Sequence, residues 1–254
     1  MDLKSVQKGG NVFLSGARTT ARRGDDMKAE VADKIAVLKK SSEFAHLADD
    51  ALAELANRAV TCSFQKGECI FREEDPSAFY YVVRSGRVKL FKQSISGKQI
   101  ITRFALPGYP LNAIVLFTDS PHFVSAVALG DTTVLRIEKS AYLSFAHRYP
   151  SHMLRIIARS EKTLNSAWER LIDAVAEKAK QRVLNVLYAL YKKYGATLDF
   201  TCLEIGELSG TTTESAIRII GELAAVDVVR HTRGTVRITN PDELAKFTRK
   251  TFDI

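Results

Sequence analysis

The sequence predicts an α+β chain in which an antiparallel β-roll is followed by a long helix and a winged helix-turn-helix. Three observations support this fold class. Between Thr61 and Ile137, β-branched and aromatic residues form short runs separated by glycines, as in compact antiparallel sheets. After Pro150, apolar residues recur in steps of three and four, which is the spacing of a helix. Finally, two short helical patterns flank Gly210 and precede a basic hairpin.

The composition of the 254 residues sets broad limits. With 46% hydrophobic residues, the chain can bury a core and has room for about two domains. The formal net charge of +8 is spread along the sequence and permits a polyanionic partner without specifying one. No apolar run approaches the ~20 residues of a membrane span and no signal peptide is evident, so we expect a cytoplasmic protein with no membrane partner.

The N-terminal half predicts a tail followed by a strand-rich domain. Residues 1–36 show no sustained period and mix Gly, Ser, Thr and charges, so we expect a variable, flexible tail. From Ile35 to Ala59 the apolar residues fall at helical spacing and predict one or two short helices. These helices and the following runs FYYVV, GRVKLF, KQIITRFAL, FVSAVAL and TTVLRI predict a β-roll domain over residues 37–150.

Residues 151–175 predict a long helix with a heptad seam. The seam is narrow and is interrupted by one glutamate, a pattern that two supercoiled helices use to pair. Burial against the β-roll of the same chain would produce a similar stripe, but the narrow seam favours a homodimer. The residues predicted to form the dimer interface are Leu154, Ile157, Glu161, Leu164, Trp168, Leu171 and Val175.

Residues 176–254 predict a winged helix-turn-helix. The stretches LEIGELSG and GTTTESAIRIIGEL read as two short helices joined by a tight turn at Gly210. Thr211 and Glu214 have the spacing of a capping box, in which each side chain bonds to the other residue's backbone N–H. One face of the second helix is apolar and should be buried; it comprises Ala216, Ile219, Ile220 and Leu223.

The opposite face of the second helix predicts contact with DNA bases. Ile217 beside Arg218 is unusual on a solvated surface, whereas an arginine can bind guanine and an aliphatic side chain can meet a thymine methyl. The following VVRHTRGTVRITN predicts a basic wing for phosphate contacts, with an ordinary charged hairpin as the alternative. The predicted DNA contacts are Thr211, Thr212, Thr213, Glu214, Ser215, Ile217, Arg218, Arg230 and Arg233.

The order of these parts resembles the Crp/Fnr family of bacterial transcription regulators over residues 37–240. The motifs that carry the resemblance are LKKSSEFAHLADDALAEL, KGECIFREEDPSAFYYVVRSGRVKLF and TTESAIR. The resemblance implies a cyclic-nucleotide-binding-like jelly roll that senses an effector, and a homodimer that reads a palindromic DNA site. Each half-site should contain a T-G-A-like core read by Glu214 and Arg218, with Ile217 helping to choose among sites. For such a regulator we also expect RNA polymerase as a partner.

The resemblance also argues against cyclic AMP as the effector. Members that bind cyclic nucleotides carry a Gly-Glu pair for the ribose and an arginine for the phosphate. Here Leu-Asn-Ala occupies residues 111–113, and Val124 precedes Ser125 where the arginine is required. Burying the phosphate without a charged partner would cost roughly several kcal/mol of binding free energy. The iron–sulfur branch needs an N-terminal cysteine cluster, and no cysteine precedes Cys62.

The remaining expectation is an apolar effector pocket whose ligand is left open. The segment PLNAIVLFTDSPHFVSA resembles members that respond to nitric oxide or nitrosative stress through haem, which makes His122 a candidate axial ligand. The alternatives are a surface-turn histidine, a small apolar or aromatic ligand, and redox sensing. The residues predicted to line or neighbour the pocket are Ile114, Leu116, Phe117, His122, Phe123, Ser125 and Trp168.

A switched DNA-binding regulator is the function that these features favour. A metal-dependent barrel enzyme would need clustered histidine and carboxylate ligands, and residues 61–137 contain only His122, so we predict no catalytic residue. A ligand-binding regulatory subunit that controls a protein partner is less favoured, because residues 176–254 already contain a DNA reader.

Overall fold

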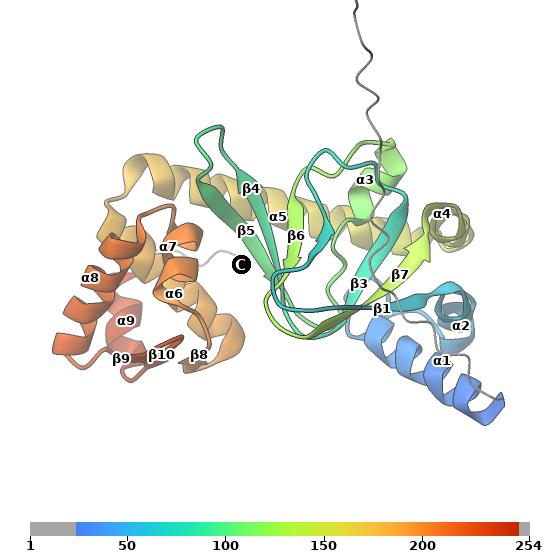
Figure 1. Ribbon diagram of the computed structural model, residues 1–254, viewed down its shortest axis with the longest axis horizontal. Helices are drawn as coiled ribbons and strands as arrows, with labels where there is room; N and C mark the ends of the chain where they lie inside the picture. The colour runs from blue at the N-terminus through green and yellow to red at the C-terminus, as the bar shows by residue number, and fades with distance from the viewer. Residues whose placement is uncertain (1–23, 249–254) are drawn as a thin grey trace, which may run out of the picture.

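The computed structural model describes residues 24–248, and Figure 1 shows a β-roll and a C-terminal helical domain joined by one long helix. The predicted fold class is confirmed: antiparallel sheets lie in the first part and a helix-turn-helix with a wing lies in the second. No helix in residues 24–248 is long and apolar enough to cross a membrane.

Two helices, α1 (Gly24–Lys39) and α2 (Asp49–Arg58), pack beside the β-roll (Figure 1). The prediction of a flexible tail over residues 1–36 is therefore wrong from Gly24 onward, and residues 1–23 lie outside the described part of the chain. Helix α1 is fixed in place because its Leu38 is fully buried in the core and its Lys34 Nζ donates to the Ala59 carbonyl, just after α2 (2.7 Å).

The β-roll consists of two antiparallel sheets, with strand orders β1-β7-β3 and β2-β6-β4-β5. An apolar cluster that includes Phe71, Tyr81, Leu111 and Val124 fills the space between the sheets. The interior of the roll is thus packed with its own side chains. The strands are β1 (Val60–Phe64), β2 (Cys69–Phe71), β3 (Phe79–Ser85), β4 (Val88–Gln93), β5 (Gln99–Ala105), β6 (Ser125–Ala128) and β7 (Thr132–Glu138).

A second core lies on the outer side of β3 and β7, beneath α1, α2, α3 (Ala113–Thr118) and α4 (Lys139–Arg148). This core contains a buried histidine, His152, whose Nδ1 lies 3.1 Å from the Glu43 carbonyl and whose Nε2 lies 3.0 Å from the Tyr142 hydroxyl. Since a carbonyl can only accept, Nδ1 carries the proton and Nε2 accepts from Tyr142. Burial lowers the pKa of His152, which keeps the ring neutral.

The long helix α5 (Pro150–Ala176) begins with a proline, which lacks an N–H and suits the first helical position. It runs behind the β-roll and reaches the C-terminal domain (Figure 1). That domain comprises α6 (Ala179–Tyr194), β8 (Thr197–Leu198), α7 (Cys202–Ser209), α8 (Thr213–Ala225), β9 (Val229–Thr232), β10 (Thr235–Ile238) and α9 (Pro241–Phe247), with the sheet order β8-β10-β9.

The C-terminal domain shares its core with the β-roll. Ile101 and Phe104, both on β5 and both fully buried, belong to the same apolar cluster as Leu187, Leu208 and Ile220 of the C-terminal domain. Helix α7 accordingly lies against β5. The position of the helix-turn-helix is therefore set partly by the roll of its own chain.

Candidate nucleic-acid interface and effector site

The first helix of the helix-turn-helix, α7, is capped at both ends. The Thr201 Oγ1 accepts from the Glu204 N–H (3.1 Å), and a Glu204 carboxylate oxygen accepts from the Thr201 N–H (2.7 Å), which together form a capping box. At the other end Gly210 adopts the left-handed conformation, φ +64°, that ends helices most readily with glycine. These two caps fix where the turn to α8 begins.

The predicted capping box of α8 is wrong, because the helix starts one residue later than expected. Thr212 is the N-cap and accepts from the Ser215 N–H (3.2 Å). Thr211 is buried in the turn, and its N–H donates to the Gly206 carbonyl (2.9 Å). This burial also corrects the expectation that the Thr211 side chain reaches DNA. The Glu214 carboxyl lies at the start of the helix, and hydrogen bonds from its own N–H and the Thr212 hydroxyl lower its pKa.

The two faces of α8 differ as the sequence predicts. The apolar face is buried, with exposed fractions of 5% or less at Ala216, Ile219, Ile220 and Leu223. On the other face Ile217 is 50% exposed, and Glu214 and Arg218 are exposed beside it. Thr212 is also exposed, and Thr213 and Ser215 are half-buried. The N-terminal half of α8 thus presents a cation, an anion and an aliphatic group to solvent.

Arg218 is held loosely on this surface. Its Nη1 donates to one Glu222 carboxylate oxygen (2.5 Å), and the Lys180 Nζ donates to the other (2.8 Å). Exposed pairs of this kind contribute little to stability, because solvent screens the two charges. The guanidinium can therefore exchange Glu222 for a base edge at little cost.

The wing, β9 and β10, places its cations in solvent. Thr232 pairs with Thr235 across a tight turn in which Gly234 has φ +86°. Arg230 and Arg233, both predicted to contact DNA, are exposed. His231 and Arg237 are exposed beside them. A hairpin that projects several cations next to α8 suits contacts with phosphates.

The seven residues predicted to form the dimer interface, called here the dimer stripe, lie along one exposed face of α5. The six apolar members are between 50% and 82% exposed, and Glu161 is exposed among them. The opposite face, with Ile156 and Asp173, is buried against the rest of the chain. Burial of the stripe against the chain's own β-roll is therefore contradicted. Ile172, 46% exposed, extends this surface, and sequence analysis missed it because it lies outside the heptad positions.

The residues predicted to line an effector pocket are not brought together. Leu116 and Phe117 belong to the core around Tyr142, whereas Ile114, Phe123 and Trp168 are exposed on separate elements. The Ser125 Oγ accepts from the Glu73 N–H (3.0 Å). The prediction of a common pocket is thus wrong, because α3, the residues before β6 and α5 direct these side chains to different parts of the chain.

His122 is also not a turn residue facing a pocket. It is 3% exposed, its ring stacks on Phe71 with centroids 3.9 Å apart, and its backbone N–H donates to the Asp75 carbonyl (3.0 Å). Burial lowers the pKa of the His122 imidazole. A haem ligand at this position would have to leave a stacked and buried site.

The segment that would hold a cyclic nucleotide has a structural role instead. Asn112 is buried; its Oδ1 accepts from the Tyr81 N–H (3.1 Å) and its Nδ2 donates to the Phe79 carbonyl (2.7 Å). Val124 is 5% exposed within the apolar cluster of the roll. The side chains at these positions supply no cation for a phosphate.

A cavity of about 460 Å³ lies between α5, β5 and the turn between α7 and α8, and we call it the junction cavity. Phe123 is the one predicted effector residue that lines it. Arg170 crosses its wall and donates to the carbonyls of Ile101 (2.6 Å), Thr102 (2.9 Å) and Leu208 (3.0 Å). Burial and the nearby cation of Arg103 lower the pKa of Arg170 to about 10. Arg170 thereby connects α5 to β5 and to the end of α7.

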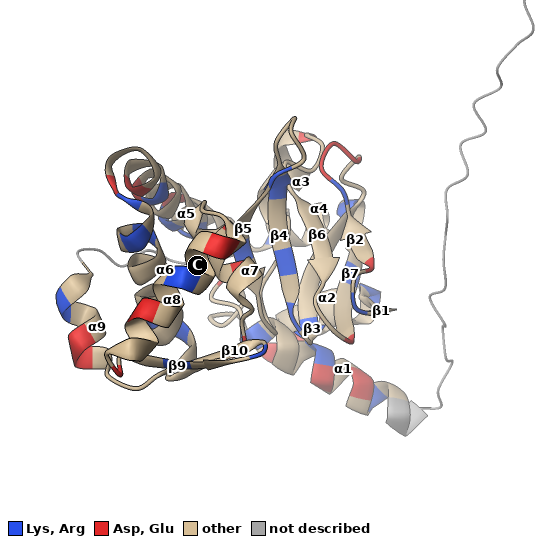
Figure 2. Ribbon diagram, turned by 60° about the vertical axis from the view of Figure 1, so that its left-hand side comes forward, with Lys and Arg blue, Asp and Glu red and all other residues tan. Residues whose placement is uncertain are grey.

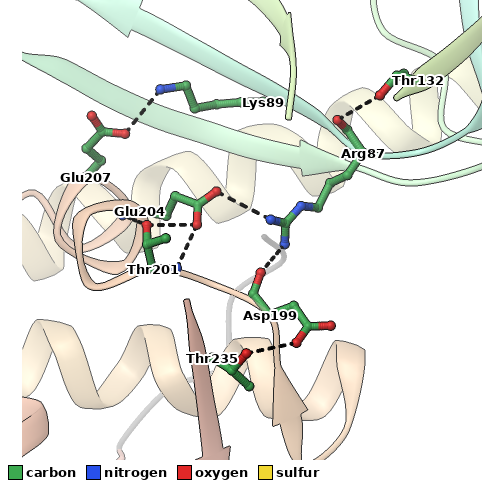
Figure 3. Close-up of polar contacts among 8 residues, drawn as sticks. All are labelled: Arg87, Lys89, Thr132, Asp199, Thr201, Glu204, Glu207 and Thr235. Atoms are coloured by element: carbon green, nitrogen blue, oxygen red, sulfur yellow. Dashed lines mark hydrogen bonds and ion pairs between the residues drawn. The ribbon is translucent and has the colours of Figure 1, made fainter. Parts of the chain in front are cut away.

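Polar contacts also join the β-roll to α7, as Figure 3 shows. Arg87 on the roll donates to the Asp199 carbonyl (2.5 Å) and lies 3.5 Å from a Glu204 carboxylate oxygen, while the Lys89 Nζ lies 3.3 Å from Glu207 Oε2. In Figure 2 the cationic segments of β4 lie beside the acidic segments of α7. Sequence analysis missed these pairs, because no local pattern links charges more than a hundred residues apart.

Comparison with known proteins then decides the family. The model of the cyclic nucleotide-binding domain matches residues 61–149, and the model of the Crp-like helix-turn-helix domain matches residues 181–247. The chain belongs to the Crp/Fnr family. Its Crp/Fnr relatives are transcription regulators, not enzymes, and the chain is accordingly a DNA-binding transcription regulator of this type.

Three Crp/Fnr proteins illustrate the similarity. The chain is 29% identical to the cyclic AMP receptor protein of Thermus thermophilus, over 69% of this chain and 82% of the relative. It is 27% identical to the transcriptional activator protein Anr of Pseudomonas protegens, over 77% and 82%. The solved structure of FixK2 from Bradyrhizobium japonicum has a TM-score of 0.69 and 22% identity, covers 76% of this chain and 98% of that one, and shows the shared fold.

Proposed function

We propose that this Crp/Fnr regulator acts as a homodimer that binds a palindromic DNA site through α8 of each subunit. The observation that carries the proposal is the exposed face of α8, which presents Glu214, Ile217 and Arg218 to solvent. The opposite face of the same helix is packed into the core. The N-terminal end of the second helix is the part that reads base edges in helix-turn-helix proteins. The exposed cations of the wing would contact phosphates on either side.

The dimer stripe on α5 supports the homodimer. Six large apolar side chains on one face of a helix form an unusually apolar surface for a monomer. Burying each one would contribute roughly 1.5–3 kcal/mol before the costs of association. Glu161 lies within the stripe, where its Oε1 accepts from the Asn165 Nδ2 (2.7 Å), and a polar residue in such a seam sets the register of the two helices.

For the effector we propose a small organic ligand bound in the junction cavity. Cyclic AMP is disfavoured by Val124 and the packed roll, and haem ligation by His122 is disfavoured by its stacking on Phe71. A ligand in the junction cavity would contact α5, β5 and the turn before α8 at once. It could then move α8 relative to the dimer, provided that it binds the two arrangements with different affinities. RNA polymerase is the partner through which the bound dimer would act.

The direct test of DNA reading is selection from a random-sequence duplex pool by the purified wild-type chain, followed by sequencing. We expect a palindrome whose half-sites contain a T-G-A-like core. Recovery of sequences without two-fold symmetry would overturn the dimeric reader, even if the protein retained affinity for DNA. Addition of RNA polymerase to the selected site, measured as a supershift, then tests the partner.

A further inference from the structure

A second cavity, of about 410 Å³, lies on the outer side of the β-roll, and we call it the basic pocket. It forms where four segments meet: the end of α1, the loop 106–110 after β5, the first half of α5 and the end of α6. The charged residues that line it are all cationic: Lys40, Arg155, Arg159, Lys162 and Lys193. None of these side chains was predicted to have a function.

A glycine lets this pocket form. Gly108 has φ +90°, and a Cβ at this position would lie 2.4 Å from the Lys40 Cβ and 3.0 Å from the Lys40 carbonyl carbon. Any other residue would push the α1 end away from the loop. The Gly108 N–H donates to the Val83 carbonyl (2.7 Å), which ties the loop to the roll. Lys40 is therefore held at the pocket by the packing of its backbone.

The floor of the pocket is neutralised, but its rim is not. Arg159 pairs with Glu43, a carboxylate with no exposure to solvent, and its Nη1 donates to the Tyr109 hydroxyl (3.2 Å). The exposed side chains of Lys40, Arg155 and Lys162 have no ion-pair partner within residues 24–248. Cations gathered around a concave surface with low-dielectric walls focus a positive potential that attracts anions.

We propose that the basic pocket binds a small molecule that carries at least two phosphate groups. Lysine binds phosphate as a point charge and arginine binds it through paired hydrogen bonds, so the rim can hold several phosphate oxygens. Leu106, Pro107 and Ala158 add apolar wall for an uncharged part of the ligand. The volume lies in the range of small-molecule sites, about 300–1,000 Å³.

This site goes beyond the proposed function, because it shares no residue with α8 or with the junction cavity. Its lining nevertheless joins the parts that a regulator must move. Arg155 and Lys162 belong to the helix that carries the dimer stripe, and Lys193 belongs to the DNA-binding domain. An anion bound between them would favour the arrangement of domains described here.

The test is isothermal titration of the full-length chain, without magnesium, using tripolyphosphate, ATP, AMP and inorganic phosphate as probes. We expect tripolyphosphate and ATP to bind at least tenfold more tightly than the two singly phosphorylated probes. Arg155→Glu with Lys162→Glu should weaken that binding at least tenfold. The control is Lys28→Glu with Lys66→Glu, which changes the net charge equally on exposed lysines outside the pocket.

Three outcomes would overturn the proposal: no binding of tripolyphosphate at millimolar concentration, equal binding by both double variants, or no difference between the multiply and singly phosphorylated probes. If the probes fail to bind but only the pocket variant loses affinity for random duplex DNA, the pocket belongs to the DNA interface instead. Circular dichroism and the oligomeric state must match the wild type; otherwise Arg155→Gln with Lys162→Gln replaces the charge reversal. The selection of a palindromic DNA site does not depend on this pocket. A negative result in the titration would therefore leave the proposed DNA binding to be tested separately.

Discussion

The outer face of α8 and the predicted effector pocket were both read from short stretches of sequence, yet only the first exists as a continuous surface. The side chains of α8 divide at Ile217 and Ile219 into an exposed and a buried face. By contrast, His122 and Phe123 are adjacent in sequence, but one is buried against Phe71 and the other is half exposed at the junction cavity. The surface of one helix is a local property, whereas a pocket depends on which elements pack around it.

The largest effect should come from the dimer stripe. Leu164→Asp with Leu171→Asp would place two charges in the helix seam and prevent pairing, so affinity for the palindrome should fall by on the order of 10³-fold or more. Sedimentation should show a monomer. The control is Ile95→Asp, at a fully exposed turn, which should leave both measurements unchanged. A double variant that remains dimeric would show that another surface holds the subunits together.

The next largest effect tests whether the roll is packed. Val124→Arg should lower the free energy of unfolding by about several kcal/mol, because the charge enters an apolar cluster without a partner. It should gain no affinity for cyclic AMP. Denaturant unfolding and a cyclic AMP titration measure the two effects, with Ile95→Arg as the exposed control. A stable variant that binds cyclic AMP would mean that the interior of the β-roll can open to a ligand. The roll would then hold a site that the sequence could predict, as the outer face of α8 does.

A smaller effect is expected from single contacts on α8 and the wing. Arg218→Ala should weaken binding to the selected palindrome by about 1–3 kcal/mol and relax specificity at one base pair. Arg230→Ala should instead weaken binding to all sequences alike and reduce the salt dependence by about one phosphate contact. Fluorescence anisotropy at several salt concentrations separates the two. Equal loss on specific and random DNA for Arg218→Ala would contradict its assignment to base reading.

The smallest effect concerns His122 and its burial. Its pKa is lowered in the folded chain, so the unfolded state binds the proton more readily. The free energy of unfolding should therefore hold above the unfolded pKa of about 6.5 and fall as the pH drops from there through the folded pKa. His152 acts in the same direction. In the variant His122→Gln, the free energy of unfolding should fall less steeply as the pH drops, which denaturant unfolding at each pH would measure. An unchanged dependence on pH would indicate that the His122 ring is accessible to solvent in the folded chain.

Much of the site could be predicted where function follows the period of a helix. The buried face of α8 was predicted correctly, and the seven residues predicted for the dimer interface do share one exposed face of α5, because side chains three and four positions apart share a face in any helix. The start of α8 was misplaced by one residue, since Thr211 and Thr212 have equal capping chemistry. Only the close approach of the turn to Gly206 decides which of them is buried.

The sequence by itself determined the order of the parts, the strands β3–β7 of the roll, the heptad face of α5 and the exposed face of α8, because each depends on neighbours within a few residues. The tertiary structure alone decided where cavities form and which charged side chains pair. The Arg87–Glu204 and Lys89–Glu207 contacts, the burial of His122 and the basic pocket around Gly108 all join segments that are distant in the chain. Their geometry depends on how sheets and helices pack, which no local spacing records.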